Sequence, residues 1–237
     1  MLLSQTCQSC AEAFLRLFYP EHCGSCSGFL DLDETILCRN CSSKVKGLRY
    51  SVEDMLTDER HAGLDHVWSL YRYEEPLKGI LTAIKFSGQR RLLRFFRGPL
   101  ADVTALLQSE SGYDGIVPIP LDRKRFLERE YNQSELIATL IEKTYVQKAR
   151  RTKLQGRLLR KPFASQPQSQ LHRSQRLVNL YGAFEVRSRE SLQGKSFLLV
   201  DDILTTGATA QEAARALKSR GAKRVDMLTL ARTERSR

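Results

Sequence analysis

Apolar positions in the C-terminal two thirds of the chain switch repeatedly between the period of a strand and that of a helix. Residues 67–73 alternate as in a strand, and residues 77–84 repeat at i, i+3, i+4 and i+7 as in a helix. The unbroken apolar run over 196–200 is typical of a strand buried in a parallel sheet. Further strands are expected over 114–120 and 225–230, and further helices over 136–142 and from 209 to about 220.

This alternation predicts an α/β fold with a mainly parallel sheet flanked by helices. Residues 132–135 (Asn-Gln-Ser-Glu) and 209–212 (Thr-Ala-Gln-Glu) are typical of capping boxes at helix starts. Gly221 is expected to end the second of these helices. Because residues 42–66 are polar and acidic, we expect a first domain over 1–66, ending in a linker, and a second over 67–237.

All six cysteines lie in the first 41 residues, as three Cys-x-x-Cys pairs. The second and third pairs are separated by 11 residues, which fits a small ribbon around tetrahedral zinc. Four cysteine ligands leave no open coordination position, so this Zn²⁺ is expected to be structural. The predicted ligands are Cys23, Cys26, Cys38 and Cys41.

The first pair, Cys7 and Cys10, is surplus to one four-ligand site. A second, incomplete site, exchange with a member of the first set, and plain thiols are all open interpretations. Redox chemistry is the alternative to zinc, but no thioredoxin-like strand and helix surround any of the pairs.

The net charge of +11 is concentrated in one stretch. Residues 143–184 hold ten basic and no acidic residues, whereas residues 1–66 hold six basic and ten acidic residues. A local anion site explains this concentration, with phosphate, pyrophosphate or a nucleic-acid backbone as the anion. The alternative is a solvated loop without a ligand.

The hydrophobic fraction of 41% is sufficient for a core and excludes a wholly disordered chain. No apolar run approaches the ~18 residues of a membrane span. The N-terminus also lacks the basic segment and apolar core of a signal peptide. We therefore expect a cytoplasmic protein without a membrane span.

The segment from Leu198 to Thr209 is the most informative about chemistry. An apolar strand ends in two carboxylates, passes through a turn rich in Thr and Gly, and enters a helix. In open α/β sheets, ligands bind at the carboxyl ends of the strands. Backbone N–H groups, Thr hydroxyls and a helix N-terminus suit a phosphate, and Gly207 permits the close approach that a phosphate cradle needs.

Asp201 and Asp202 suit vicinal hydroxyls or the ligand shell of Mg²⁺. A sugar 5-phosphate satisfies both halves of the motif. The motifs of P-loop NTPases and of dinucleotide-binding strands are absent from the sequence. A strand–turn–helix with one capping threonine accounts for one Thr but not for the two carboxylates and the Thr-Thr-Gly-Ala-Thr run together.

These residues resemble the phosphoribosyl diphosphate (PRPP) motif of type I phosphoribosyltransferases. Further segments at 84–88, 116–121, 129–134 and 182–184 follow in the order seen in the ComF/ComFC family, and the resemblance extends over about residues 14–232. It implies a type I phosphoribosyltransferase-like domain joined to a small N-terminal zinc-ribbon-like module. It also implies a role in natural transformation, handling incoming single-stranded DNA on the cytoplasmic side, where protein partners could hold the chain at the inner face of the membrane.

The resemblance further implies roles for individual residues. Asp201 and Asp202 would hold the ribose hydroxyls and Mg²⁺ of bound PRPP. The residues that would hold the 5-phosphate are Thr205, Thr206, Gly207, Ala208 and Thr209.

Two basic segments are given roles in the same way. Arg123, Lys124 and Arg125 occupy the position of the pyrophosphate loop. The stretch 143–184 occupies that of a mobile loop closing over PRPP. Asp122 stands where His is common and Glu130 where Gly is common, so we assign no catalytic residue. The candidates for DNA contact are Arg150, Arg151, Lys153, Arg157, Arg160 and Lys161.

Three functions follow as hypotheses. The first is a DNA-uptake factor that binds single-stranded DNA and has a PRPP site. The second is an active PRPP-dependent phosphoribosyltransferase of unknown acceptor. The third is a zinc-ribbon adaptor that recruits a helicase-type competence partner.

Overall fold

The structure, a computed structural model, describes residues 21–57, 61–108, 112–144, 152–162, 182–188 and 190–234. These residues divide into two compact units. The larger unit combines Tyr50–Tyr73 with the part of the chain from Phe96 onward. The smaller unit combines the residues before Tyr50 with Glu74–Phe95. In the described part of the chain, no helix is long and apolar enough to cross a membrane.

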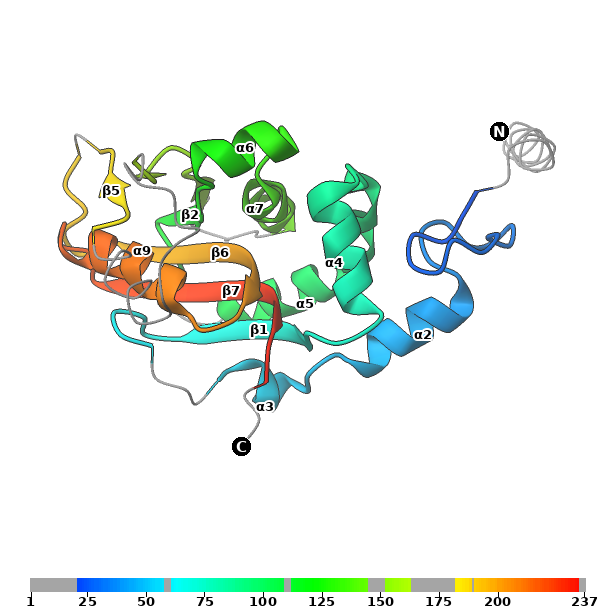
Figure 1. The fold of residues 1–237 in the computed structure, drawn as a ribbon. Helices are drawn as coiled ribbons and strands as arrows, with labels where there is room; N and C mark the ends of the chain where they lie inside the picture. Colours follow the sequence, from blue (N-terminus) through cyan, green and yellow to red (C-terminus); the bar gives the residue numbers. More distant parts are fainter. Residues whose placement is uncertain are drawn as a thin grey trace, which may run out of the picture. The chain divides into compact units, whose positions relative to one another are not determined.

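The larger unit is built on a five-stranded sheet in which every pairing is parallel (Figure 1). The strand order is β1-β7-β6-β2-β3. The expected mainly parallel α/β sheet is therefore confirmed. Its strands are β1 (Val67–Arg72), β2 (Gly115–Pro118), β3 (Lys153–Leu154), β6 (Ser196–Leu204) and β7 (Arg224–Arg232).

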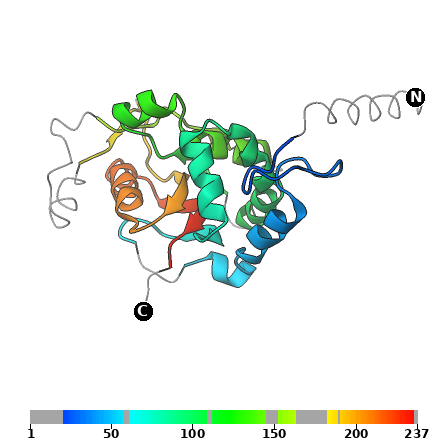
Figure 2. The same ribbon diagram turned by 45° about the vertical axis from the view of Figure 1, so that its right-hand side comes forward.

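Helices cover both faces of this sheet. In Figure 2, α9 (Ala208–Lys218), in orange, lies on one side of the strands, and α5 (Arg97–Gln108) and α7 (Gln133–Thr144), in green, lie on the other. The face under α9 packs Phe197 and Leu199 of β6 against alanines of the helix. Right-handed crossovers that leave the middle of a sheet in opposite directions place their helices on opposite faces, which accounts for this arrangement.

The starts of α7 and α9 have different causes. Asn132 precedes α7, and its Oδ1 accepts a hydrogen bond from the N–H of Ser134 over 3.1 Å, as a capping side chain does. The expected cap of α9 at Thr209 is wrong, because α9 begins at Ala208 with Gly207 as its N-cap in the left-handed conformation. Gly207 has no side chain to cap α9, and the N–H of Ala208, the first residue of the helix, donates to Oγ1 of Thr206 over 3.4 Å.

The remaining elements of the larger unit are short. They are α3 (Val52–Met55), α6 (Arg123–Arg129) and an antiparallel pair formed by β4 (Leu159–Arg160) and β5 (Glu185–Val186).

The smaller unit contains α2 (Arg39–Gly47), α4 (Leu77–Phe86) and most of the 3₁₀ helix η1 (Arg90–Phe96). The helical period read from residues 77–84 is confirmed, because α4 buries Leu77, Ile80, Leu81 and Ile84. Gly24, in the cysteine loop, lies against Leu92 of η1 so closely that a Cβ at this position would overlap the leucine side chain.

Candidate functional site

The order of the strands reverses between β2 and β6. From β2 the chain passes through α6 and α7 to β3 on one side, and from β6 it passes through α9 to β7 on the other. In open α/β sheets, the crevice outside the carboxyl ends of two such strands is the usual ligand site. Asp201 and Asp202 lie near the carboxyl end of β6, and residues 119–134 follow the end of β2.

One hydrogen bond joins the two sides of this switch point. The hydroxyl of Ser134, in the first turn of α7, donates to Oδ1 of Asp201 over 2.7 Å. The backbone N–H of Asp202 donates to the same oxygen over 2.9 Å. The side-chain amide of Asn132 donates to the carbonyl of Ile119 over 3.0 Å and so ties the start of α7 to the end of β2. These contacts fix the orientation of the Asp201 carboxylate.

Ser134 was not expected to be a site residue. The sequence identified it as part of a capping motif at positions 132–135 and of the family segment 129–134, without a role in the site. The residue is 2% exposed, so the hydroxyl is committed to the Asp201 carboxylate and not to solvent. The signal that could have identified Ser134 is a serine at the start of a helix that follows β2, the strand next to the one that carries the carboxylates.

The loop from Thr205 to Gly207 connects Asp202 to α9 within a few residues. Gly207 has φ of 76°, which favours glycine, and Thr205 and Thr206 are exposed. Backbone N–H groups at the start of an 11-residue helix carry a partial positive charge that suits a phosphate. The predicted carboxylates and the predicted phosphate loop therefore lie in one continuous segment, from the end of β6 to the start of α9, at the carboxyl edge of the sheet.

The segment predicted as the pyrophosphate loop forms the helix α6. Arg123, Lys124 and Arg125 are all exposed on it. Asp122 is the N-cap: its Oδ1 accepts the N–H of Arg125 over 2.9 Å. The capping hydrogen bond explains why this loop is helical here, since Asp is a preferred N-cap residue.

Glu130 ends α6 in a left-handed conformation with φ of 62°. Its N–H donates to the carbonyl of Phe126 over 2.7 Å, which closes the helix. Non-glycine residues are strained in this region. The glycine that is common at this position in the family that the sequence resembles would adopt this conformation without strain.

The described DNA-contact candidates lie on different elements. Lys153 lies on β3 opposite Gly115, at the amino ends of the strands. Arg157 and Arg160 are exposed, on or beside β4. Arg150 and Arg151 lie outside the described residues, as do Cys7 and Cys10.

Lys161 differs from these residues because it is half-buried. Burial lowers the pKa of its ammonium group, while attraction to the carboxylates of Asp122 and Asp201 opposes this shift. Its Nζ lies 5.8 Å from the centre of the Phe184 ring. The positive charge of Lys161 therefore interacts electrostatically with the carboxylates of Asp122 and Asp201.

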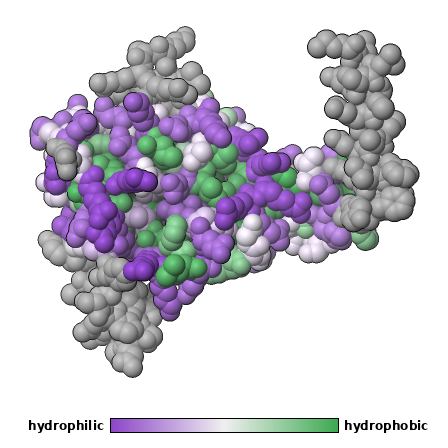
Figure 3. All heavy atoms as spheres, turned by 90° about the horizontal axis from the view of Figure 1, so that it is seen from above, coloured by the Kyte–Doolittle hydropathy of each residue, from purple (hydrophilic) through white to green (hydrophobic). Residues whose placement is uncertain are grey.

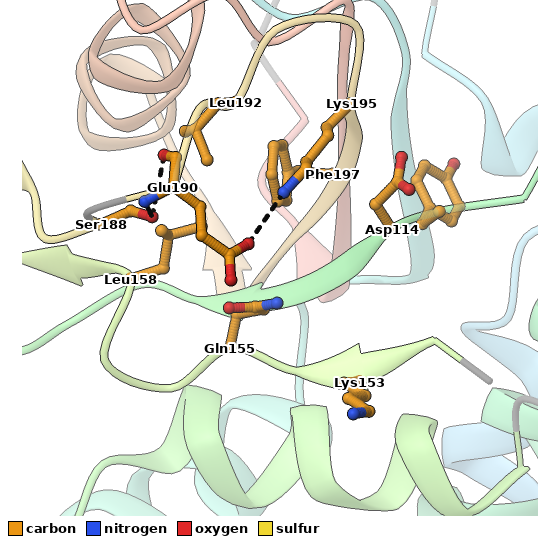
Figure 4. A pocket seen from close by; sticks show the side chains of 10 residues that line it. Asp114, Lys153, Gln155, Leu158, Ser188, Glu190, Leu192, Lys195 and Phe197 are labelled. Atoms are coloured by element: carbon orange, nitrogen blue, oxygen red, sulfur yellow. Dashed lines mark hydrogen bonds and ion pairs between the residues drawn. The ribbon is translucent and has the colours of Figure 1, made fainter.

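A cavity of about 210 Å³ lies at the opposite end of the sheet (Figure 4). Asp114 and Lys195 line it and immediately precede β2 and β6, whereas Asp201 and Asp202 lie toward the carboxyl end of β6. An ion pair of 3.1 Å between Lys195 and Glu190 closes one side. This cavity is therefore separate from the carboxylate and phosphate-loop site.

The four predicted metal ligands of the smaller unit converge. The Sγ atoms of Cys23, Cys26, Cys38 and Cys41 lie within 4.8 Å of one another. Those of Cys26 and Cys38 are 3.8 Å apart. Tetrahedral zinc with bonds of about 2.3 Å to sulfur needs edges of about 3.8 Å, so the set fits the ion.

Backbone N–H groups support thiolates in this cluster. The N–H of Cys38 donates to Sγ of Cys23 over 3.3 Å. Burial acts to raise the pKa of the Cys23 thiol, but hydrogen bonds from the backbone of Cys26, Cys38 and Ser25 lower it to about 7. Burial raises the pKa of Cys41 to about 12. A bound cation would stabilise all four thiolates.

Comparison with known proteins agrees with this arrangement. Residues 141–237 match the family model described as a phosphoribosyl transferase domain. The chain is 28% identical over 198 residues to the competence protein ComFC of Bacillus subtilis, covering 83% of this chain and 72% of the relative. It is 25% identical over 231 residues to competence protein F of Haemophilus influenzae, covering 91% and 98%. It is 28% identical over 164 residues to the DNA utilization protein YhgH of Escherichia coli K12, covering 68% and 69%. These similarities support membership of the ComF/ComFC family, and the larger unit has the phosphoribosyltransferase-like fold.

Proposed function

We propose that this protein is a competence factor that binds PRPP with Mg²⁺ and single-stranded DNA during DNA uptake. The observation that carries the PRPP part is the hydrogen bond between Ser134 and Asp201 at the switch point of the sheet. It holds a carboxylate beside a phosphate loop, which is the pair of groups that a phosphorylated ribose needs.

The residues divide the ligand between them. Asp201 and Asp202 accept hydrogen bonds from the ribose hydroxyls, and the loop from Thr205 to Thr209 donates to the 5-phosphate. Arg123, Lys124 and Arg125 on α6, together with Lys161, attract the pyrophosphate. Mg²⁺, when bound, would neutralise the charge of the diphosphate next to the carboxylates.

The DNA part rests on the charge of the chain and on the names of its relatives, two of which are competence proteins and one a DNA utilization protein. Arg157 and Arg160 offer exposed positive charge. On α6, Phe126 and Leu127 are exposed beside the basic residues, and single-strand binders combine aromatic stacking with basic side chains in this way. Helix α6 lies at the top of Figure 1, and the view from above in Figure 3 shows hydrophilic residues around smaller hydrophobic areas.

Thermal unfolding with added PRPP and Mg²⁺ tests the ribose site. Saturating ligand should raise the Tm of the wild type, because a ligand that binds only the folded state stabilises it. The Asp201→Asn/Asp202→Asn variant should show no such rise. An unchanged Tm in the wild type would contradict PRPP binding and would favour the adaptor hypothesis, in which the zinc module recruits a helicase-type partner.

Catalysis is the second candidate function, and Lys161 favours it. A half-buried cation that interacts electrostatically with Asp122 and Asp201 is suited to stabilise charge on a departing pyrophosphate. Release of pyrophosphate from PRPP with a panel of nucleobases and amines tests this activity. No release with any acceptor would restrict the site to binding.

We also propose that Zn²⁺ on the four cysteines is structural. The closed set of four sulfur ligands supports the structural role.

A further inference from the structure

Residues 61–66, which we call the α9 strap, follow α9 from its first turn to its last. His61 contacts Gln211, and a Cβ at Gly63 would lie 3.5 Å from that of Ala214. Asp65 pairs with Lys218 over 2.7 Å and accepts the N–H of Val225 over 2.7 Å. The strap is thus held at both ends, and His61 is its contact at the phosphate end of the helix.

His61 lies directly against Gly207, the N-cap of α9. The imidazole is in a residue only 5% exposed. A Cβ on residue 207 would lie 2.6 Å from Cε1 of the ring and closer still to Nδ1, inside the distance that real side chains keep. Gly207 is therefore required for two reasons: its φ of 76° and the space that the imidazole occupies.

The same imidazole also contacts the first turn of α9. Its Nδ1 lies 3.2 Å from Nε2 of Gln211. The backbone N–H of Gln211 in turn donates to the carbonyl of Gly207 over 2.9 Å. His61 therefore braces the cap residue and the first helical turn together, and these are the backbone groups that face a phosphate at a helix start.

We propose that His61 is a positioning residue for phosphate binding, which holds Gly207 and the first turn of α9 in the geometry that receives the 5-phosphate. The proposal rests on the proposed PRPP site. It assigns to the strap a role in ligand affinity, in addition to its packing along α9. Because His61 acts through Gly207 and Gln211, its loss should weaken binding without removing any group that contacts the ligand.

Calorimetric titration of PRPP with Mg²⁺ into the full chain tests this role. His61→Ala should weaken affinity about five- to tenfold, as expected when a hydrogen bond and a packing contact are lost. His61→Asn keeps an acceptor near the position of Nδ1 and should recover part of the affinity. Gln211→Ala removes the same hydrogen bond with a good helix former and should also weaken affinity.

Asp65→Asn is the matched control, because it breaks the ion pair at the far end of the strap. It should lower Tm yet leave PRPP affinity within about twofold of wild type. Two results would overturn the role of His61: affinity within twofold of wild type in both His61→Ala and Gln211→Ala, or an equal loss in Asp65→Asn. If wild type itself binds no PRPP, the proposed function fails first, and the positioning role fails with it.

Discussion

The hydroxyl of Ser134 and the carboxylate of Asp201 are joined by a hydrogen bond of 2.7 Å that connects the start of α7 to the end of β6. Because β2 and β6 are adjacent strands whose connections leave in opposite directions, this bond spans the switch point of the sheet. A carboxylate that is held in one orientation can meet ribose hydroxyls without first losing conformational freedom.

Replacing Ser134 with Ala should therefore reduce both stability and ligand affinity. Loss of a buried hydrogen bond to a carboxylate costs about 1–3 kcal/mol of unfolding free energy. PRPP affinity should fall about tenfold, since the Asp201 carboxylate loses its fixed orientation. Urea unfolding and calorimetry measure the two effects. Thr139→Ala is the control on the same helix, because the Thr139 hydroxyl donates to the carbonyl of Glu135 within α7. Equal affinity in the two variants would contradict the role of the Ser134 bond.

Gly207→Ala should destabilise the larger unit more than Gly194→Ala does. Both glycines have positive φ, 76° and 74°, so both variants carry a strain of about 1 kcal/mol. Only Gly207 lies against another side chain, that of His61, whereas the space around Gly194 is open. The difference between the losses of unfolding free energy in the two variants measures the cost of the overlap with His61. Equal losses would show that the His61 side chain moves aside without cost.

Glu130→Gly should stabilise the protein by about 1 kcal/mol, because glycine accepts the left-handed conformation at the end of α6 without strain. Glu128→Gly, inside the same helix, should destabilise by a similar amount. Denaturant melts of the two variants would give opposite signs. A loss of stability in Glu130→Gly would mean that the Glu130 side chain makes a compensating contact.

Lys161 and Arg160 are neighbours in the sequence with different expected roles. Lys161→Ala should weaken PRPP binding, since the half-buried ammonium interacts electrostatically with the carboxylates of Asp122 and Asp201. Arg160→Ala should leave PRPP binding unchanged and should reduce the salt dependence of single-stranded DNA binding, by a slope of about 0.7 if Arg160 contacts one phosphate. Titrations of PRPP and of single-stranded DNA at several salt concentrations separate these effects. Weaker PRPP binding in Arg160→Ala, with PRPP binding unchanged in Lys161→Ala, would contradict both assignments.

Removal of zinc should unfold the smaller unit before the larger one. Wild type is expected to hold one Zn²⁺ on Cys23, Cys26, Cys38 and Cys41, and Cys41→Ser should lose it. Metal analysis and proteolysis of chelated protein measure the loss. Ser43→Ala, an exposed position on α2, is the control. Retention of zinc in Cys41→Ser would indicate that another residue completes the site.

The sequence predicted the elements whose signals are local. The apolar run over 196–200 and the carboxylates that follow it identified β6 and the site edge, and the spacing of Leu77, Ile80, Leu81 and Ile84 identified α4. The four clustered cysteines were also predictable, because their spacing alone limits the arrangement.

Three features could not be predicted from local sequence signals: the start of α9, the helical form of α6 and the role of His61. The start of α9 at Ala208 depends on the left-handed conformation of Gly207, which the threonine-based motif did not indicate. The helical form of α6 depends on the single cap at Asp122. His61 has no local signal, since its importance arises only where a distant segment meets Gly207.

Calorimetric titration of PRPP with Mg²⁺ tests the central claim most directly, with wild type and the Asp201→Asn/Asp202→Asn variant compared under the same conditions. The account predicts one site per chain in wild type and no detectable binding in the variant. Equal binding by both proteins, or none by the wild type, would contradict a phosphorylated-ribose site at the carboxyl ends of β2 and β6.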